Sequence, residues 1–71
     1  MKNIEINQEP IALYQVLKLE ALVSSGGEAK VAIDNGRVSV NGDIEIRRRK
    51  KIMCGDIIEF ESERFKIVIK S

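Results

Sequence analysis

The spacing of apolar residues changes at Gly36, and this change limits the fold more than any other feature of the chain. Between Pro10 and Gly36, apolar residues recur at intervals of three and four, the spacing that gives a helix one buried face. Beyond Gly36 they alternate with polar residues, which is the spacing of a strand with one buried face. Helices that lead and strands that follow are typical of an α+β domain.

Two short helices are expected in the first half of the chain. Residues 10–19 form the first, because Pro10 suits an opening turn in which its missing N–H costs nothing. Residues 26–35 form the second, because Ser25 followed three residues later by Glu28 is a capping-box pattern. The short Ser/Gly turn between them predicts an αα-hairpin.

Short strands are expected on both sides of the helices. Asn41-Gly42 marks a two-residue hairpin turn, because both central positions of a type I′ turn need a positive φ. Further turns are expected at Gly55-Asp56 and at residues 62–64. The expected strands are residues 2–6, 37–40, 43–46, 57–61 and 65–69. We therefore predict an αα-hairpin packed on a small, twisted antiparallel sheet.

Length and composition limit the function. A chain of 71 residues fits one domain, so we expect residues 1–71 to form a single monomeric unit. The chain contains no histidine, and Cys54 is the only cysteine, so we expect no catalytic residues, no metal and no cofactor. The N-terminus lacks the apolar core of a signal peptide, and no apolar run is long enough to span a membrane. We therefore expect a cytoplasmic protein with no membrane partner.

Five consecutive cations carry the strongest functional signal. The chain has 12 basic and 11 acidic residues, so seven basic residues accompany the eleven acidic ones outside this run. Clustered Lys and Arg side chains bind phosphate backbones and release counterions. The run therefore predicts a nucleic-acid contact made by Arg47, Arg48, Arg49, Lys50 and Lys51. The alternative is a solvated loop that aids solubility.

The same run conflicts with the strand pattern that precedes it. If the strand continued through the run, Arg48 and Lys50 would share the face of Ile44, Ile46 and Ile52. A charged residue on a buried face is costly, so we expect either a bulge here or a strand that extends beyond the core.

Other polar residues extend the predicted site. We expect Lys30 on the second helix and Arg37 after it to enlarge the basic patch, although both also fit ordinary surface charge. Lys18, Ser25 and Asn41 are secondary candidates for RNA contact. Lys18 also fits the exposed face of the first helix, Ser25 is first a helix cap, and Asn41 is first a turn residue.

The aromatic residues indicate the kind of nucleic acid. Tyr14, Phe60 and Phe65 all fall in apolar patterns, so we expect them in the core. None is interleaved with the basic run, which argues against a stacking platform for unpaired bases. Recognition of structured RNA through shape and phosphates fits the sequence better.

Acidic residues are expected on a different surface. Asp56, Glu59, Glu61 and Glu63 recur near the end of the chain and are expected on one solvent-facing strand surface. Such a surface repels nucleic acid, so binding is expected on the basic side alone.

The segment from Ser25 to Gly42 resembles the core of the S4 RNA-binding domain. The family carries a serine at the start of its second helix, then spaced small and apolar residues, a glycine and a V-x-V-N-G strand and turn. The matching positions here are Ser25, Ala29, Ile33, Gly36, Val38, Val40, Asn41 and Gly42. Gly55-Asp56-Ile57-Ile58 resembles the later G-D-x-I turn of the family, so the similarity spans about residues 10–60.

Within the family, the chain is most similar to small stand-alone bacterial proteins of the YbcJ/YaaA type. These carry S-G-x-x-A-K at the second helix and a basic run after the hairpin, whereas broader S4 domains place an arginine where this chain has Gly26. The resemblance implies an αL-type motif that binds ribosomal RNA or a ribosome-assembly intermediate, with transfer RNA as the next candidate. It also implies ribosomal particles as partners.

Parts of the sequence also fit two other functions and one other ligand. The basic run also fits a protein-interaction adaptor that docks an acidic partner. The V-N-G and G-D-I-I patterns also occur in ubiquitin-like sulfur carriers, but these need a C-terminal Gly-Gly, and this chain ends Ile69-Lys70-Ser71. DNA remains an alternative to RNA, because phosphate contacts alone do not distinguish the two.

Overall fold

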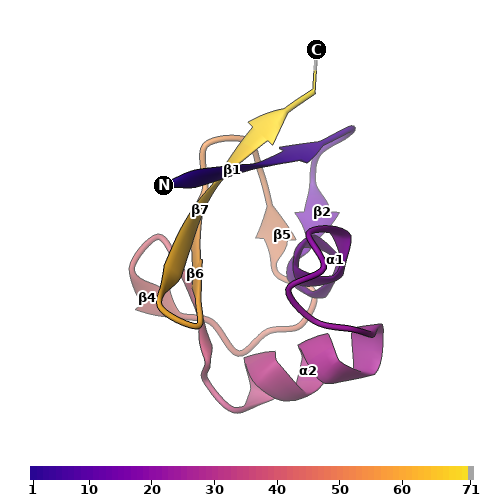
Figure 1. The fold of residues 1–71 in the computed structure, drawn as a ribbon, viewed down its shortest axis with the longest axis vertical. Helices are drawn as coiled ribbons and strands as arrows, with labels where there is room; N and C mark the ends of the chain where they lie inside the picture. Colours follow the sequence, from indigo (N-terminus) through magenta and orange to yellow (C-terminus); the bar gives the residue numbers. More distant parts are fainter. Residues whose placement is uncertain (71) are drawn as a thin grey trace.

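A computed structural model describes residues 1–70, and Ser71 lies outside the described part. The elements follow one another as β1 (Lys2–Ile6), β2 (Ile11–Ala12), α1 (Leu13–Leu19), α2 (Gly26–Asp34), β3 (Val38–Val40), β4 (Asp43–Ile44), β5 (Lys51–Ile52), β6 (Ile57–Phe60) and β7 (Glu63–Ile69). The predicted α+β class is confirmed, and α1 and α2 pack against each other beside the sheet (Figure 1). No helix within residues 1–70 is long and apolar enough to cross a membrane.

The main sheet is mixed, which corrects the prediction of an antiparallel sheet. Its strand order is β1-β7-β6-β3-β4, and β2 pairs with β5 in a separate two-stranded sheet (Figure 1). β1 runs parallel to β7, with Ile4 opposite Ile67, whereas the other neighbours in the main sheet are antiparallel. The alternation in residues 2–6 shows that a strand forms, but alternation does not encode the direction in which a strand pairs.

The first helix begins later than predicted. Residues 11–12 are extended and pair with β5, so that Ile11 lies opposite Ile52. α1 therefore begins at Leu13 rather than at Pro10. Pairing with Ile52, 41 residues away in the sequence, overrides the local helical pattern here.

Several strand boundaries also differ from the prediction. β4 ends at Ile44, so the basic run continues neither as a bulged strand nor as an extension beyond the core, and the predicted conflict of faces does not arise. The turn between β6 and β7 lies at Glu61 and Ser62, whose φ angles are 53° and 67°, and β7 begins at Glu63. The turn predicted at residues 62–64 is therefore shifted, because neither turn residue is the glycine that usually marks such a position.

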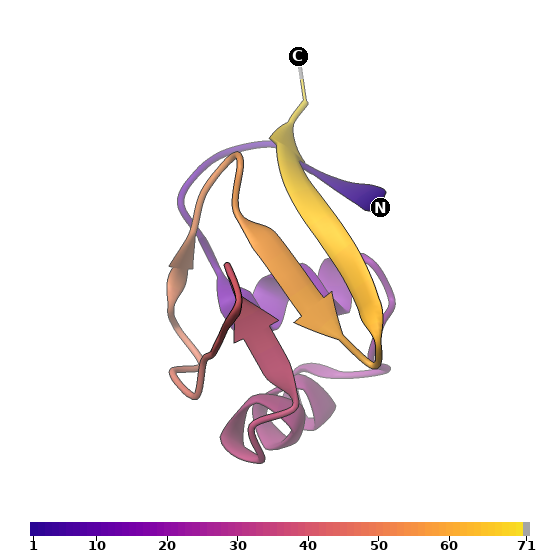
Figure 2. The ribbon, with the colours of Figure 1, turned by 90° about the vertical axis from the view of Figure 1, so that its left-hand side faces the viewer.

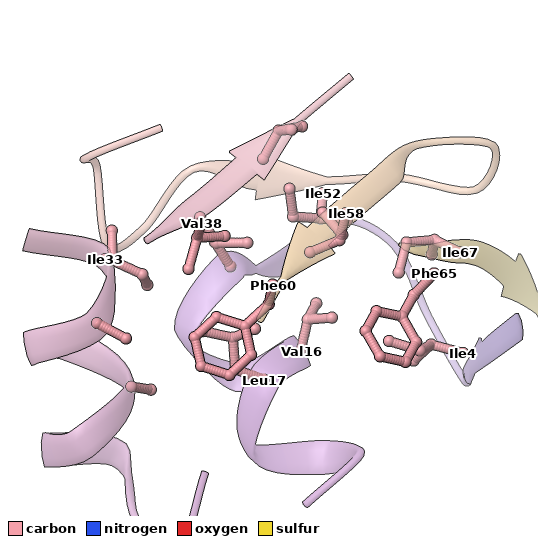
Figure 3. Packing of buried hydrophobic residues seen from close by; sticks show 14 of the residues in the cluster. Ile4, Val16, Leu17, Ile33, Val38, Ile52, Ile58, Phe60, Phe65 and Ile67 are labelled. Atoms are coloured by element: carbon pink, nitrogen blue, oxygen red, sulfur yellow. The ribbon is translucent and has the colours of Figure 1, made fainter. Parts of the chain in front are cut away.

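A single apolar cluster lies between the helices and one face of the sheet (Figure 3). Val16 and Leu17 of α1 contact side chains from the strands, and Figure 2 shows α1 behind β6 and β7. Phe60 and Phe65 are buried and Tyr14 packs against the cluster, which confirms that the aromatic residues belong to the core. One face of the sheet is thus buried by the helices.

Candidate nucleic-acid interface

The five consecutive cations lie at the end of the connection from β4 to β5, and the last of them, Lys51, is the first residue of β5. This stretch, Arg47 to Lys51, is hereafter the cationic segment. It contains a turn in which the Lys50 N–H donates to the Arg47 carbonyl at 3.2 Å. In Figure 1 the chain leaves β4, passes α2 and rises to β5 beside α1. The segment therefore lies next to both helices.

The backbone of the cationic segment caps α1. The Leu13 N–H donates to the Lys50 carbonyl at 3.0 Å, and the Tyr14 N–H donates to the Arg48 carbonyl at 3.2 Å. The first N–H groups of a helix have no partner inside the helix, and the N-cap residue Ala12 offers no side-chain acceptor. The carbonyls of the segment supply the missing acceptors and tie its backbone to the start of the helix.

Two arginines of the segment are bound to carboxylates. The Arg47 guanidinium donates to the Glu45 carboxylate from Nε at 2.9 Å and from Nη2 at 3.1 Å. The Arg47 backbone N–H donates to the same carboxylate at 3.0 Å. Arg48 reaches Asp34, the last residue of α2, with its Nε at 3.0 Å and with a second bond from Nη2. Paired guanidinium bonds of this kind combine charge with a fixed geometry.

These ion pairs shift the pKa values of the groups that form them. The Arg47 side chain, hydrogen-bonded to Glu45, lowers the pKa of that carboxyl to about 2. The Arg48 side chain lowers the pKa of Asp34 in the same way. Hydrogen bonds to Glu45 and Asp34 raise the pKa values of Arg47 and Arg48 in turn. Both pairs are therefore fully ionised at neutral pH.

Three cations of the segment keep their charge free for a ligand. Within residues 1–70, Arg49, Lys50 and Lys51 make no salt bridge. Together with Arg47 they line an open hollow of about 340 Å³. Arg48 is not part of that lining, in agreement with its bond to Asp34. The hollow thus offers several positive groups to an anion, which is what phosphate recognition requires.

Two predicted lysines lie beside Tyr14. The Lys30 Nζ lies 5.4 Å from the centre of the Tyr14 ring. Lys18, one helical turn after Tyr14, lines a second hollow with Tyr14 and Gln15. Since Tyr14 is hydrogen-bonded to the backbone of Arg48, the structure brings Lys18 and Lys30 together around one side chain next to the segment.

Arg37 is already engaged with the sheet. It pairs with Glu61 in the turn after β6, and its guanidinium lies 5.5 Å from the centre of the Phe60 ring. The structure thus places Arg37 against β6 and its turn, and its role in RNA binding stays a prediction.

Ser25 and Asn41 use their side chains within the fold. The Ser25 hydroxyl accepts from the Glu28 N–H at 3.1 Å, so the predicted cap of α2 is confirmed. The Glu28 carboxylate bonds to Ser24 rather than to Ser25. The Asn41 amide accepts from the Ile57 N–H at 2.9 Å and donates to Asp56 at 3.1 Å. RNA contact by Ser25 or Asn41 stays a prediction, and each has a structural role without it.

The acidic residues were expected to share one strand face, but the structure places them on different parts of the sheet. Glu59 pairs with Arg64 across the strands at 3.6 Å, whereas Glu61 lies in the turn and pairs with Arg37. Glu63 begins the next strand, and Lys2 bonds to it at 2.8 Å. The turn after β6 interrupts the alternation, so these carboxylates are dispersed and largely paired with cations. The prediction of one repelling acidic face is therefore wrong.

Asp34 and Glu45 are the residues of the site that the sequence reasoning missed. Glu45 precedes Arg47 by two residues, and this spacing on an extended chain is a usable signal for the pair. No comparable signal links Asp34 to Arg48, because the contact depends on how α2 packs beside the connection. Within the described part of the chain, no three His, Cys, Asp or Glu side chains are placed to hold a metal ion.

Comparisons of sequence place the chain among known proteins. A family model described as the S4 domain matches residues 4–68. The protein YbcJ of Escherichia coli (strain K12) is 36% identical over 69 residues, which cover 96% of this chain and 99% of that protein. A protein of Bacillus subtilis (strain 168), named as the probable ribosome maturation protein RlbA, is 41% identical over 58 residues, which cover 82% of each chain.

Two solved structures share the fold. The solution structure of Escherichia coli YbcJ, described as containing an αL motif involved in RNA binding, matches with a TM-score of 0.72 and 36% identity, over 96% of this chain and 87% of that one. The 30S ribosomal protein S4e of Thermoplasma acidophilum matches with a TM-score of 0.62 and 23% identity, over 86% of this chain and 32% of that one. The second likeness concerns the fold alone.

Proposed function

Because the chain belongs to the S4 domain family, we propose that it binds structured RNA through the cationic segment and has no catalytic activity. The observation that carries the proposal is the hollow lined by Arg47, Arg49, Lys50 and Lys51, on a connection whose backbone is fixed to α1. A cluster of cations held in place loses little conformational freedom when it meets a row of phosphates. Lys18 and Lys30 extend the same surface toward α1 and α2.

Folded RNA is the ligand that suits this surface. Phe60 and Phe65 are buried, and the Tyr14 ring is half-buried with Lys30 beside it. The chain therefore offers no row of exposed rings on which unpaired bases stack. Double-helical RNA is read mainly through its shape, phosphates and 2′-hydroxyls, which is contact of the kind that Lys and Arg side chains make.

Ribosomal RNA is the target that we propose. The Bacillus subtilis relative carries the name of a ribosome maturation protein, and the YbcJ structure is described as having a motif involved in RNA binding. We therefore propose that this chain acts in the cytoplasm as a monomer, on ribosomal RNA or on a ribosome-assembly particle. Transfer RNA is the second candidate.

A binding assay with matched charge variants tests the proposal. We expect the triple variant Arg49→Gln, Lys50→Gln, Lys51→Gln to lose roughly 100-fold or more in affinity for structured ribosomal RNA, because each charged hydrogen bond contributes on the order of 1.5 kcal/mol or more. The control variant Lys2→Gln, Lys66→Gln, Lys70→Gln removes the same charge from β1, β7 and the residue after β7, and should bind nearly as the unmodified chain does. Equal losses in both triple variants would show that only net charge matters.

Sequencing of RNA cross-linked to the tagged protein in cells then identifies the target. We expect enrichment of one ribosomal RNA region with the unmodified chain and its loss with the triple variant. Sparse and equal recovery from both proteins would contradict RNA as the ligand.

A protein partner is the second candidate function. Ile44 and Ile46 precede the cationic segment, and these residues are 67% and 63% exposed. Exposed apolar groups beside a basic cluster also suit an acidic protein partner with an apolar strip. Capture of one defined acidic protein that survives ribonuclease treatment would favour this function.

A further inference from the structure

Arg48 is the one cation of the segment that does not line the hollow. Its guanidinium donates two hydrogen bonds to the Asp34 carboxylate at the end of α2 instead. Its carbonyl accepts from the Tyr14 N–H at the start of α1. One residue thus links the connection to both helices, through its side chain at one end and its backbone at the other.

We propose that Arg48 is a positioning residue, held by Asp34, and that Arg49, Lys50 and Lys51 are the residues of the segment that contact RNA phosphates. The inference rests on the proposed function and divides the tasks within that site. It makes Asp34, an acidic residue, a contributor to RNA affinity.

The physical reason is the mutual repulsion of the cations. Consecutive like charges favour an extended and mobile chain, and ordering that chain at the moment of binding lowers affinity. The pair of Arg48 and Asp34 fixes the turn before any ligand arrives. It also pairs one charge of the run with a carboxylate and directs that charge toward α2, while the three unpaired cations stay at the surface.

The proposal reverses the result expected from charge alone. Asp34→Asn removes a negative charge beside a cationic site, so simple electrostatics predicts tighter RNA binding. If Asp34 positions the segment, the same change weakens binding, by about two- to fivefold given the usual strength of an exposed ion pair. Asp34→Glu keeps the carboxylate and should recover most of the affinity.

Amide hydrogen exchange tests the positioning role without RNA. The N–H groups of Leu13 and Tyr14 are held by carbonyls of the segment, so their exchange reports whether it stays in place. We expect Asp34→Asn and Arg48→Gln to speed exchange at both amides by about two- to fivefold. Arg49→Gln should leave both rates unchanged. The Ile67 N–H, which donates to the Asp56 carbonyl at 2.9 Å, lies away from the segment and serves as the control amide, so its exchange should not change in any variant.

The salt dependence of RNA affinity separates positioning from contact. Loss of one phosphate contact lowers the slope of log affinity against log salt by about 0.7 to 0.9. We expect that loss of slope for Arg49→Gln. Arg48→Gln should weaken binding with an unchanged slope, and the double variant Asp34→Asn, Arg48→Gln should bind no more weakly than Arg48→Gln alone.

Three results would each overturn this inference. The first is tighter RNA binding by Asp34→Asn, and the second is unchanged amide exchange at Leu13 and Tyr14 in Asp34→Asn and Arg48→Gln. The third is a lower salt slope for Arg48→Gln. In those cases RNA binding by the unmodified chain and its loss in the triple variant of Arg49, Lys50 and Lys51 would leave the proposed function standing. If the unmodified chain binds no structured RNA, the proposed function fails, and the assignment of Asp34 to RNA binding fails with it.

Discussion

At the scale of single residues, the site depends on carboxylates that position cations. Glu45 accepts three hydrogen bonds from Arg47, two from the guanidinium and one from the backbone. These bonds favour the ionised carboxylate and keep the guanidinium of Arg47 at the edge of the hollow. The position of a cation in this site is therefore decided by an acidic neighbour as much as by the cation itself.

A pH titration tests the bond between Glu45 and Arg47. The pKa of Glu45 is lowered from 4.5 to about 2, so its stabilising effect is complete above pH 4.5 and is lost as the pH falls toward 2. We expect a midpoint near pH 2 when the Glu45 carboxyl is followed by NMR, and a clearly higher midpoint in Arg47→Gln. A midpoint near 4.5 in the unmodified chain would show that the bond does not form in solution.

At the scale of elements, the two helices end in the same motif but with different residues. After α1, the Ala21 N–H bonds to the Lys18 carbonyl at 3.1 Å and the Leu22 N–H to the Leu17 carbonyl at 3.0 Å. The Gly36 and Arg37 N–H groups make the equivalent bonds after α2. This is the Schellman motif, in which glycine is the usual residue at the left-handed position. Ala21 holds that position with φ 56°.

Substitutions at Ala21 and Gly36 test how much the left-handed position costs in free energy of unfolding. We expect Ala21→Gly to raise the free energy of unfolding by about 0.5–1 kcal/mol, because glycine adopts a positive φ without steric cost. We expect Gly36→Ala, at φ 73°, to lower it by about 1 kcal/mol. Urea denaturation measures both changes. A destabilised Ala21→Gly variant would contradict this explanation.

The same elements show which parts of the fold the sequence could predict. Both ends of α2 were predicted to within one residue, because Ser25 and Gly36 mark them locally. The start of α1 was missed, because Ile11 pairs with Ile52 and no local signal reports a partner so distant in sequence. The cations of the candidate site could be proposed from the sequence for the opposite reason, since they form one uninterrupted run. Their anchor Asp34 was missed because packing alone brings it to Arg48.

At the scale of the whole molecule, stability depends on one small core. A chain of this length has a free energy of unfolding of about 3–10 kcal/mol. Ile4 in β1 is fully buried, although it lies in a strand at the edge of the sheet. Ile44, in the strand at the opposite edge, is 67% exposed. The two edge strands therefore contribute very differently to the core.

Truncation of these two isoleucines tests that difference. We expect Ile4→Ala to lower the free energy of unfolding by about 2–5 kcal/mol, because it leaves a cavity in a closely packed cluster. Ile44→Ala should change it by less than about 0.5 kcal/mol. Thermal and urea unfolding give both values. Similar losses in the two variants would mean that β4 contributes to the core as much as β1 does.

The parallel pairing of β1 with β7 has a consequence for the synthesis of the protein. Lys2 lies opposite Phe65, so β1 gains its partner only after β7 has been made. During translation, β1 is therefore an unpaired edge, and loop closure over nearly the whole chain precedes completion of the sheet. The anchors of the cationic segment lie between residues 11 and 52, and all of them emerge before β7. We expect the sheet to close only after β7 has emerged from the ribosome.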